Sequence, residues 1–451
     1  MDARASGRRP HRGERRDGAV RGVRGLAVSV AARRSVPAAG SADPGGGHDS
    51  ALAAGGFVAP DLHAAAAMWR AQVGAVEVHF GAGALAALGE VVRSAAGPGV
   101  ERVLLVTDPG VRRAGHAEAA AAALAGSGLA ADLFDAVGEN PTTAQVAAGA
   151  AFAAPRAPGA IVAVGGGSAM DCAKGINFLL TNGGRMEDYE GRDRAIRPML
   201  PSVGVPTTAG TGSEAQRFAL IARAEDHRKM ACGDAGARFR AVVLDPALAA
   251  TAPRRVAAAA GLDAVSHALE SAVTTAGNPV SRMLAREAWR LLDGALPAVL
   301  SAPEELAAVG RALLGAHLAG AAIEQSMLGA AHACANPLTA RFGVAHGLAV
   351  ALMLPHVVRF NAAAAADVYG ELAAAAGLAG AGAGADPAVA LARRIESLRA
   401  GAGLPGRLAD CGVPAHALPA LAAEATTQWT GRFNPRPVTE SDFLRLYEAA
   451  G

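Results

Sequence analysis

The feature that most constrains the fold is a change of pattern near residue 250. Before it, short apolar runs of strand length at 76–80, 103–107, 132–136 and 160–164 alternate with helical segments. After Pro246 the chain carries helical patterns and no clear strand. Alternating strands and helices favour a parallel sheet with helices on both faces. We therefore predict an α/β domain with a doubly wound parallel sheet at residues 61–248, followed by an all-α domain at residues 249–451.

Residues 1–60 have a different character. Ten arginines precede position 35, followed by Pro, Gly, Ser and Ala with little apolar periodicity. We interpret this stretch as a disordered extension, or as the product of a start codon placed too far upstream, with a functional basic arm as the alternative. The net charge is only +2, so nothing beyond this stretch indicates a nucleic-acid surface.

Apolar residues make up 51% of the chain, yet no uninterrupted run reaches the roughly 18 residues of a membrane span. The four cysteines lack CxxC spacing. They are typical of reduced thiols in an intracellular protein rather than of a disulfide framework. We therefore predict a cytoplasmic protein without membrane partners.

A glycine-rich turn follows the strand predicted at 160–164. It consists of Gly165, Gly166, Gly167 and Ser168, and a helix begins there. Backbone N–H groups and the positive end of the helix dipole meet at such a turn, which suits a pyrophosphate. The turn is neither GxGxxG nor an ATP-binding P-loop, so a tight turn without a ligand remains the alternative.

A second loop, residues 206–214, reads Pro-Thr-Thr-Ala-Gly-Thr-Gly-Ser-Glu. Its hydroxyls and amides can bind phosphate, ribose or a carboxamide. Lysine is rare in this Arg-rich chain, since only Lys174 and Lys229 occur among 42 basic residues. A lysine kept against that bias indicates a position that needs a compact ammonium group.

Asp263 and His267 stand four residues apart in a predicted helix, so their side chains share one face. A solvated ion pair is the plain interpretation, and a pair of metal ligands is the functional one. His332 lies in an almost purely apolar helix, and His346 lies at a turn beside Gly347. One carboxylate with three imidazoles suits Fe(II) or Zn(II) rather than Ca(II) or Mg(II). Spacing alone does not exclude His317, His356 or His416.

Taken together, these motifs resemble the iron-containing (group III) alcohol dehydrogenase family over roughly residues 60–450. The resemblance rests on Gly165–Ser168 with Asp171 and Lys174, on the loop 206–214, on Gly261–His267, and on His332 with the His346-Gly347 pair. It implies a Rossmann-like domain followed by a helical metal-binding domain, the fold shared with dehydroquinate synthase. It further implies NAD-linked interconversion of an alcohol and its aldehyde or ketone by hydride transfer, in a cleft between the domains. Family members are often dimers or larger homo-oligomers.

The resemblance also implies site residues. The metal, Fe(II) or Zn(II), would be held by Asp263, His267, His332 and His346, and it would bind the substrate oxygen. Asp108 would face the adenosine ribose, where a carboxylate favours NAD over NADP. The cofactor contacts implied or indicated by the two loops are Asp108, Asn140, Gly166, Gly167, Ser168, Asp171, Thr207, Thr208, Thr211, Ser213, Leu220 and Lys229.

One position departs from the family pattern. Many members carry a further histidine four residues after the third ligand, where this chain has Asn336. An amide cannot transfer a proton at neutral pH, so we consider His356 as a substitute and place His267, Asn336 and His356 among the catalytic candidates.

Three other functions remain open from the sequence. They are polyol oxidation as in glycerol dehydrogenase, a lyase reaction as in dehydroquinate synthase, and nucleotide binding without catalysis.

Overall fold

The computed structural model describes residues 68–226, 228–378 and 386–451. The predicted extension at residues 1–60 lies outside the described residues. Within them, seven strands form one sheet and three short strands form another.

The larger sheet is parallel except at one edge, where β1 pairs antiparallel with β2. Its strands are nearly continuous apolar runs, as expected where both faces are covered. In spatial order they are β1 (Trp69–Val73), β2 (Val76–Phe80), β10 (Ala241–Leu244), β7 (Ser202–Pro206), β5 (Ala160–Gly165), β3 (Arg102–Val106) and β4 (Ala130–Phe134).

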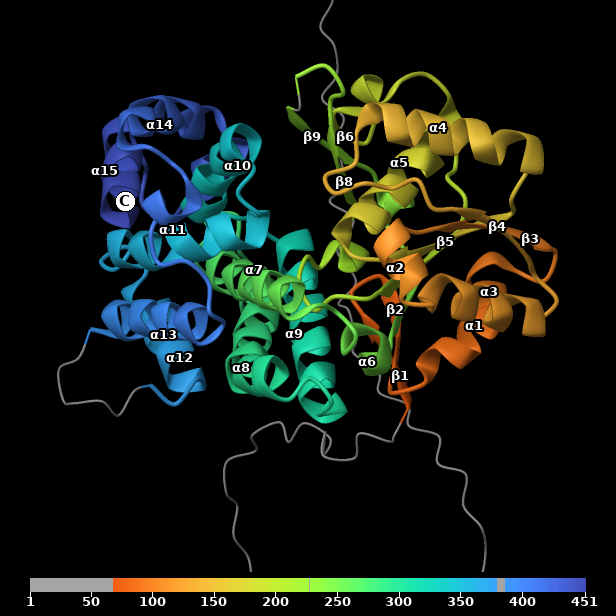
Figure 1. Cartoon of the computed structure of the whole chain (residues 1–451), viewed down its shortest axis with the longest axis horizontal. Coiled ribbons are helices and arrows are strands. Elements are labelled where there is room, and N and C mark those ends of the chain that lie inside the picture. Colours follow the sequence, from red (N-terminus) through yellow and green to blue (C-terminus); the bar gives the residue numbers. More distant parts are fainter. Residues whose placement is uncertain (1–67, 227, 379–385) are drawn as a thin grey trace, which may run out of the picture. The chain divides into compact units, whose positions relative to one another are not determined.

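Helices cover the two faces of this sheet (Figure 1). The chain runs from β3 outward to β4 and then returns to β5 on the other side of β3. This reversal makes β3 and β5 the switch point, where the carboxyl ends of a doubly wound sheet form a ligand crevice. The helices of this part are α1 (Leu88–Ala96), α2 (Pro109–Arg113), α3 (His116–Gly126), α4 (Thr143–Ala153) and α5 (Gly167–Asn182).

The smaller sheet pairs β8 with β9 as an antiparallel hairpin and adds β6 beside β9. Lys229 is the first residue of β9. Its strands are β6 (Gly191–Arg192), β8 (Phe218–Ala222) and β9 (Lys229–Gly233).

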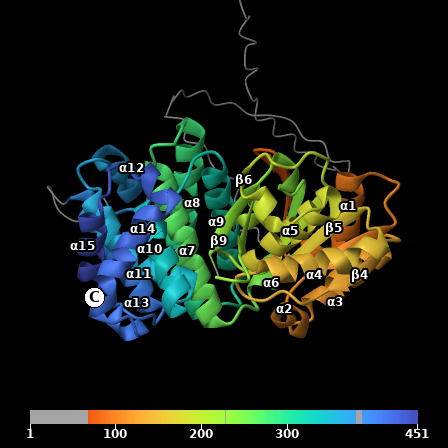
Figure 2. The ribbon, with the colours of Figure 1, turned by 90° about the horizontal axis from the view of Figure 1, so that it is seen from above.

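From residue 246 onward the described chain is helical, which confirms the predicted fold class. The helix α7 is buried from Gly261 to Val273 and packs against α8, α9 and α11 (Figures 1 and 2). The helices are α6 (Pro246–Ala249), α7 (Arg254–Val273), α8 (Pro279–Ser301), α9 (Leu306–Glu324), α10 (Ala330–Phe342), α11 (His346–Phe360), α12 (Ala366–Ala375), α13 (Pro387–Gly401), α14 (Leu418–Thr427) and α15 (Glu440–Ala450).

The helix α9 connects two of the three apolar clusters. Leu313 belongs to the cluster that includes the sheet, while Ala319 belongs to the cluster of the helical part. Among the described residues α9 is long and apolar enough to cross a membrane, but 78% of its most apolar stretch is buried inside the protein.

Candidate metal centre and dinucleotide site

Three imidazole side chains converge on one carboxylate oxygen in the helical part. The Oδ1 atom of Asp263 lies 3.4 Å from Nε2 of His267, 3.7 Å from Nε2 of His332 and 3.9 Å from Nε2 of His346. The helix α7 supplies Asp263 and His267 one turn apart, α10 supplies His332, and His346 begins α11. The pair Asp263–His267 is therefore buried, which excludes the solvated ion pair considered from the sequence.

This cluster fits a divalent metal ion. Oδ1 of Asp263 and Nε2 of His332 are buried and have no hydrogen-bond partner in the structure. Buried polar atoms without partners are costly unless a ligand satisfies them. Ligand bonds of about 2.0–2.2 Å in tetrahedral geometry place neighbouring donor atoms at about 3.3–3.6 Å, close to the observed spacing. One carboxylate and three imidazoles are donors that Fe(II) and Zn(II) accept.

His346 is the outermost of the four. Asp263, His267 and His332 form a compact group with donor atoms within 4.8 Å of one another, and this group does not include His346. Its ring centre is 5.4 Å from that of His332. A shift of its side chain toward Asp263 would complete the four-ligand set.

The electrostatics of three of the four groups favour metal binding. Burial alone would raise the pKa of Asp263, but the facing imidazoles hold it well below its ordinary value. Burial, together with the nearby Lys229 ammonium, lowers the pKa of His346 to about 3. Burial also lowers the pKa of His267. Metal ligands must be deprotonated, and these three groups are held in that form.

His332 differs because it has an acidic partner. Burial lowers the pKa of its imidazole, but Glu270 and Asp263 outweigh that effect and raise it to about 9. The Nδ1 atom of His332 lies 2.5 Å from Oε2 of Glu270. Glu270 was not among our predicted site residues. The sequence could have indicated it, because Glu270 follows Asp263 by seven residues and His267 by three and so shares their helical face.

The glycine turn has the geometry of an anion site. Gly165 ends β5, Gly166 precedes α5, and Gly167 is the first residue of the helix. A Cβ atom at Gly167 would lie 2.7 Å from Cγ2 of Thr211, so this approach requires glycine. The loop 206–214 thus lies directly against the helix start. The oxygen Oδ1 of Asp108 accepts bonds from the first N–H groups of α2 at 2.8 and 3.0 Å, on Gly110 and Val111.

Several other predicted cofactor residues lie at the same edge of the sheet. The backbone N–H of Asn140 donates to Oγ of Ser168 at 3.3 Å. The N–H of Thr207 donates to the carbonyl of Gly165 at 3.0 Å, and Thr208 lies beside Gly166. Strand ends and helix starts therefore bring two distant loops together at the switch point.

Leu220 and Lys229 project from one face of the hairpin β8–β9, because Leu220 pairs with Ala231 and Ala222 pairs with Lys229. Leu220 is 38% exposed although it is a large apolar residue. Burial lowers the pKa of Lys229, while the carboxylates of Asp171 and Asp263 oppose that effect. Lys229 is thus close enough to the metal cluster to interact electrostatically with Asp263 and His346.

Two predicted cofactor residues are instead engaged with each other. Ser213 donates from Oγ to Oδ1 of Asp171 at 2.6 Å, and both side chains are buried. Lys174 donates to the carbonyl and Oγ of Ser213 at 2.7 and 2.8 Å, and to the carbonyl of Phe218 at 2.7 Å. This network connects α5, the loop and β8. The structure therefore gives Asp171 and Ser213 internal partners rather than an open position toward a ligand.

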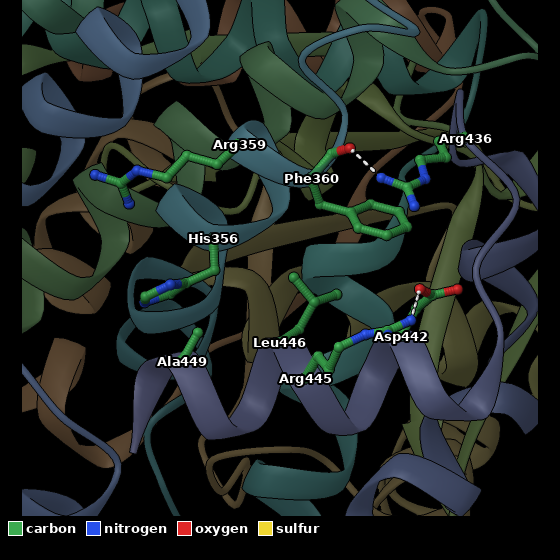
Figure 3. Close-up of a pocket in the computed structure, with 8 residues that line it drawn as sticks. All are labelled: His356, Arg359, Phe360, Arg436, Asp442, Arg445, Leu446 and Ala449. Atoms are coloured by element: carbon green, nitrogen blue, oxygen red, sulfur yellow. Dashed lines mark hydrogen bonds and ion pairs between the residues drawn. The ribbon is translucent and has the colours of Figure 1, made fainter.

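His356 is not brought into the site. It lies ten residues after His346 on α11, which corresponds to about 15 Å along a helix axis. It lines a separate pocket of about 480 Å³ with Arg359, Phe360, Arg436, Asp442, Arg445, Leu446 and Ala449 (Figure 3). Burial, with the charge of Arg359, lowers its pKa to about 4. The structure therefore does not support His356 as the residue that replaces the proton-transferring histidine absent at position 336.

Asn336 lies one turn after His332 on α10. Its Nδ2 donates to Oε1 of Gln428 at 3.0 Å. The next residue, Trp429, has its ring 6.0 Å from that of Phe218 on β8. Asn336 is thus bonded to the segment of the helical part that contacts the smaller sheet.

The loop 206–214 also reaches the helices of the metal cluster. A Cβ atom at Gly210 would lie 2.6 Å from Cβ of Ala260 on α7. A Cβ atom at Gly320 on α9 would lie 2.4 Å from the carbonyl oxygen of Gly212. Glu214 of this loop lies 3.2 Å from Nδ1 of His317 on α9. One loop therefore contacts both the glycine turn and the helical part.

Comparison with known proteins agrees with this geometry. Residues 75–246 match the family model of the iron-containing alcohol dehydrogenases, and residues 257–451 match the C-terminal model of that family. Alcohol dehydrogenase 4 of Schizosaccharomyces pombe is 33% identical over 282 residues, which cover 62% of this chain and 66% of that protein.

Two other relatives are covered almost completely. The NAD-dependent methanol dehydrogenase of Bacillus methanolicus is 30% identical over 357 residues, 78% of this chain and 93% of that protein. A crystal structure of 1,3-propanediol oxidoreductase has a TM-score of 0.79 at 31% identity, and covers 83% of this chain and 97% of that one. The chain therefore belongs to the iron-containing alcohol dehydrogenase family and is an NAD-linked oxidoreductase of alcohols and aldehydes.

Proposed function

We propose that Asp263, His267, His332 and His346 hold the catalytic Fe(II), or Zn(II), and that the substrate oxygen binds there. The convergence of three Nε2 atoms on Oδ1 of Asp263 is the observation that carries this proposal. When bound, the divalent ion acts as a Lewis acid toward the substrate oxygen, and NAD exchanges hydride with the substrate carbon.

We assign dinucleotide binding to the crevice beside β3 and β5. The N–H groups at the start of α5 suit the pyrophosphate, and the hydroxyls of Thr207, Thr208 and Thr211 lie against that turn. Asp108 keeps one carboxylate oxygen free of the bonds that cap α2, and that oxygen suits the adenosine ribose. In this proposal residues 61–248 bind the dinucleotide and residues 249–451 bind the metal.

Lys229 joins the two sites. Its ammonium group influences His346 and Asp263, and it lies on the same face as the exposed Leu220. We propose that Lys229 donates to the part of the cofactor nearest the metal, where a compact cation with three donors is useful. Asn336 can orient a substrate through its amide, but it cannot carry the proton.

The substrate class is a small alcohol or its aldehyde. Relatives that the chain covers almost completely include a methanol dehydrogenase and a 1,3-propanediol oxidoreductase. These names support short alcohols and diols as the first compounds to test. A cytoplasmic location and a homodimer or larger homo-oligomer stay predictions from the sequence and its resemblance.

Replacing one ligand tests the proposal. His332→Ala should lose bound metal and NADH formation from alcohols, because the remaining donors no longer enclose the ion. The variant should still bind NAD, as measured by calorimetry, because the crevice at β3 and β5 is unchanged. The control is His416→Ala, which alters an exposed histidine outside the site. A His332→Ala enzyme that oxidises alcohols at the wild-type rate would refute the assignment.

A further inference from the structure

We infer that Glu270 is a positioning residue for the metal centre, one that fixes the tautomer and orientation of His332 and anchors the start of α10. This inference rests on the proposed metal site. It concerns a carboxylate that would not itself contact metal, cofactor or substrate.

The first observation is that both oxygens of Glu270 are occupied. Oε2 lies 2.5 Å from Nδ1 of His332, and Oε1 accepts a bond from the backbone N–H of Ala331 at 2.7 Å. The side chain is buried, with 4% of its surface exposed. A buried carboxylate with two short bonds to neighbouring residues of α10 holds both of them in one geometry.

The second observation concerns the tautomer. A carboxylate only accepts hydrogen bonds, so the proton between it and His332 belongs to Nδ1. The lone pair of Nε2 is then directed away from Glu270, toward Oδ1 of Asp263 and the neighbouring imidazoles. Such carboxylate–histidine pairs orient the ring and increase its basicity as a ligand.

The third observation is that α10 begins without a cap of its own. Gly329 precedes the helix and offers no side-chain bond to its first N–H groups. Those groups are satisfied by other elements: Ala331 donates to Glu270 on α7, and Ala330 donates to Oδ1 of Asn434 at 3.3 Å. The negative charge of Glu270 at this N-terminus also interacts favourably with the helix dipole.

The fourth observation is the close approach that this arrangement requires. A Cβ atom at Gly329 would lie 3.0 Å from Oε1 of Glu270 and 3.1 Å from Oδ1 of Asn434. Any side chain at position 329 therefore displaces the carboxylate or the helix start. Glu270 thus connects the α7 ligand face, which carries Asp263 and His267, to the α10 ligand.

Glu270→Gln separates this role from simple packing. The amide has nearly the same size, but it offers one acceptor where Ala331 N–H and His332 Nδ1–H need two. If the amide nitrogen faces His332, the imidazole must present a lone pair at Nδ1 and a proton at Nε2. That tautomer cannot bind metal through Nε2.

The experiment measures metal affinity in the full chain with Co(II) as the probe. Chelator competition should show binding weaker by about 10- to 100-fold in Glu270→Gln than in wild type. The visible spectrum of bound Co(II) should also change, because one ligand is displaced. Gly329→Ala should produce a weaker effect in the same direction while leaving the carboxylate charge intact.

The matched control is Glu214→Gln. It alters another buried glutamate that contacts a histidine, His317, but it lies outside the ligand set. Its Co(II) affinity should equal that of wild type. Thermal unfolding of the metal-free variants shows whether each one is folded.

The outcomes are distinguishable. If wild type binds no metal, the proposed metal centre is wrong. If wild type binds Co(II) and both Glu270→Gln and Gly329→Ala bind it with wild-type affinity and spectrum, then the role of Glu270 is refuted while the metal centre stands. If Glu270→Gln does not fold, wild-type affinity in Gly329→Ala alone refutes the role.

Discussion

At the residue scale, the two lysines have different surroundings although both lie in motif-bearing segments. The Lys174 ammonium is buried and has three oxygen partners within the protein. No hydrogen-bond or salt-bridge partner is found for the ammonium group of Lys229 among the described residues. This group acts electrostatically on Asp263 and His346 of the metal cluster. Rarity in an Arg-rich chain indicated that both positions need an ammonium group. The structure shows internal oxygen partners for the ammonium of Lys174, while the cofactor role of Lys229 stays a proposal.

Lys229→Gln should weaken NAD binding by about 10- to 100-fold, because a hydrogen bond from a charged donor contributes about 1.5–3 kcal/mol. Titration of the cofactor by calorimetry checks this. Lys229→Arg should also bind NAD weakly, since the guanidinium is larger than the ammonium and planar. The control is Arg228→Gln, which removes an exposed salt bridge to Glu190. Unchanged NAD affinity in Lys229→Gln would remove Lys229 from the cofactor site.

Residue identity indicated the proposed metal ligands only in part. The spacing of Asp263 and His267 indicated a shared face, but His332 and His346 came from the family resemblance, because spacing left His317, His356 and His416 open. Glu270 was not predicted, because its two partners, Ala331 and His332, lie on another helix, α10. Residues that hydrogen-bond to a metal-ligating side chain can be identified only when the packing of helices distant in sequence is known.

At the element scale, the helix α5 depends on its buried polar network. Nζ of Lys174 lies 3.7 Å from Oδ1 of Asp171. The hydroxyl of Ser213 accepts a hydrogen bond from Lys174 and donates one to Asp171. The network fixes the loop 206–214 and β8 relative to α5. It therefore positions the glycine turn indirectly.

Lys174→Met should destabilise the fold by about 3–5 kcal/mol, because it removes the ammonium group that lies 3.7 Å from the buried Asp171 carboxylate. Urea unfolding of wild type and variant measures this change. Lys229→Gln is the comparison, and its unfolding midpoint should stay close to that of wild type. Equal stability of Lys174→Met and wild type would contradict the structural role given to the network.

Most elements could be predicted from periodicity, and the exceptions have physical reasons. The strands β5 and β7 are short apolar runs ended by glycine or threonine loops, which predict buried parallel strands. The strand β9 begins with Lys229, a residue uncommon in strands, and its pairing with β8 comes from contacts across the chain. The separate sheet of β6, β9 and β8 depends on those contacts too.

At the scale of the whole molecule, the contact between the loop 206–214 and α9 joins the cofactor loops to the helical part. Gly212 and Gly320 approach through their backbones, and Arg217 donates to Glu324 of α9 at 2.7 Å. Glycine permits the approach because neither residue carries a Cβ atom. This contact sets the spacing between the proposed cofactor loops and the proposed metal ligands.

Gly320→Ala should destabilise the protein by about 1–3 kcal/mol and raise the KM for NAD, since its Cβ atom collides with the Gly212 carbonyl. Thermal unfolding and steady-state kinetics measure the two effects. The matched control is Gly294→Ala on α8, where no atom lies within 4 Å of the added carbon. That substitution should be neutral or stabilising by about 0.5–1 kcal/mol. If Gly320→Ala has the stability and the KM for NAD of wild type, then the backbone contact between Gly212 and Gly320 does not constrain the structure.

The most direct test of the central claim is removal and restoration of the metal in the anaerobically purified protein. NADH formation is followed with alcohols of graded length, beginning with methanol and 1,3-propanediol. We predict that chelation abolishes alcohol oxidation, that Fe(II) or Zn(II) restores it, and that the metal-free protein still binds NAD. Full alcohol oxidation by metal-free protein would contradict the account.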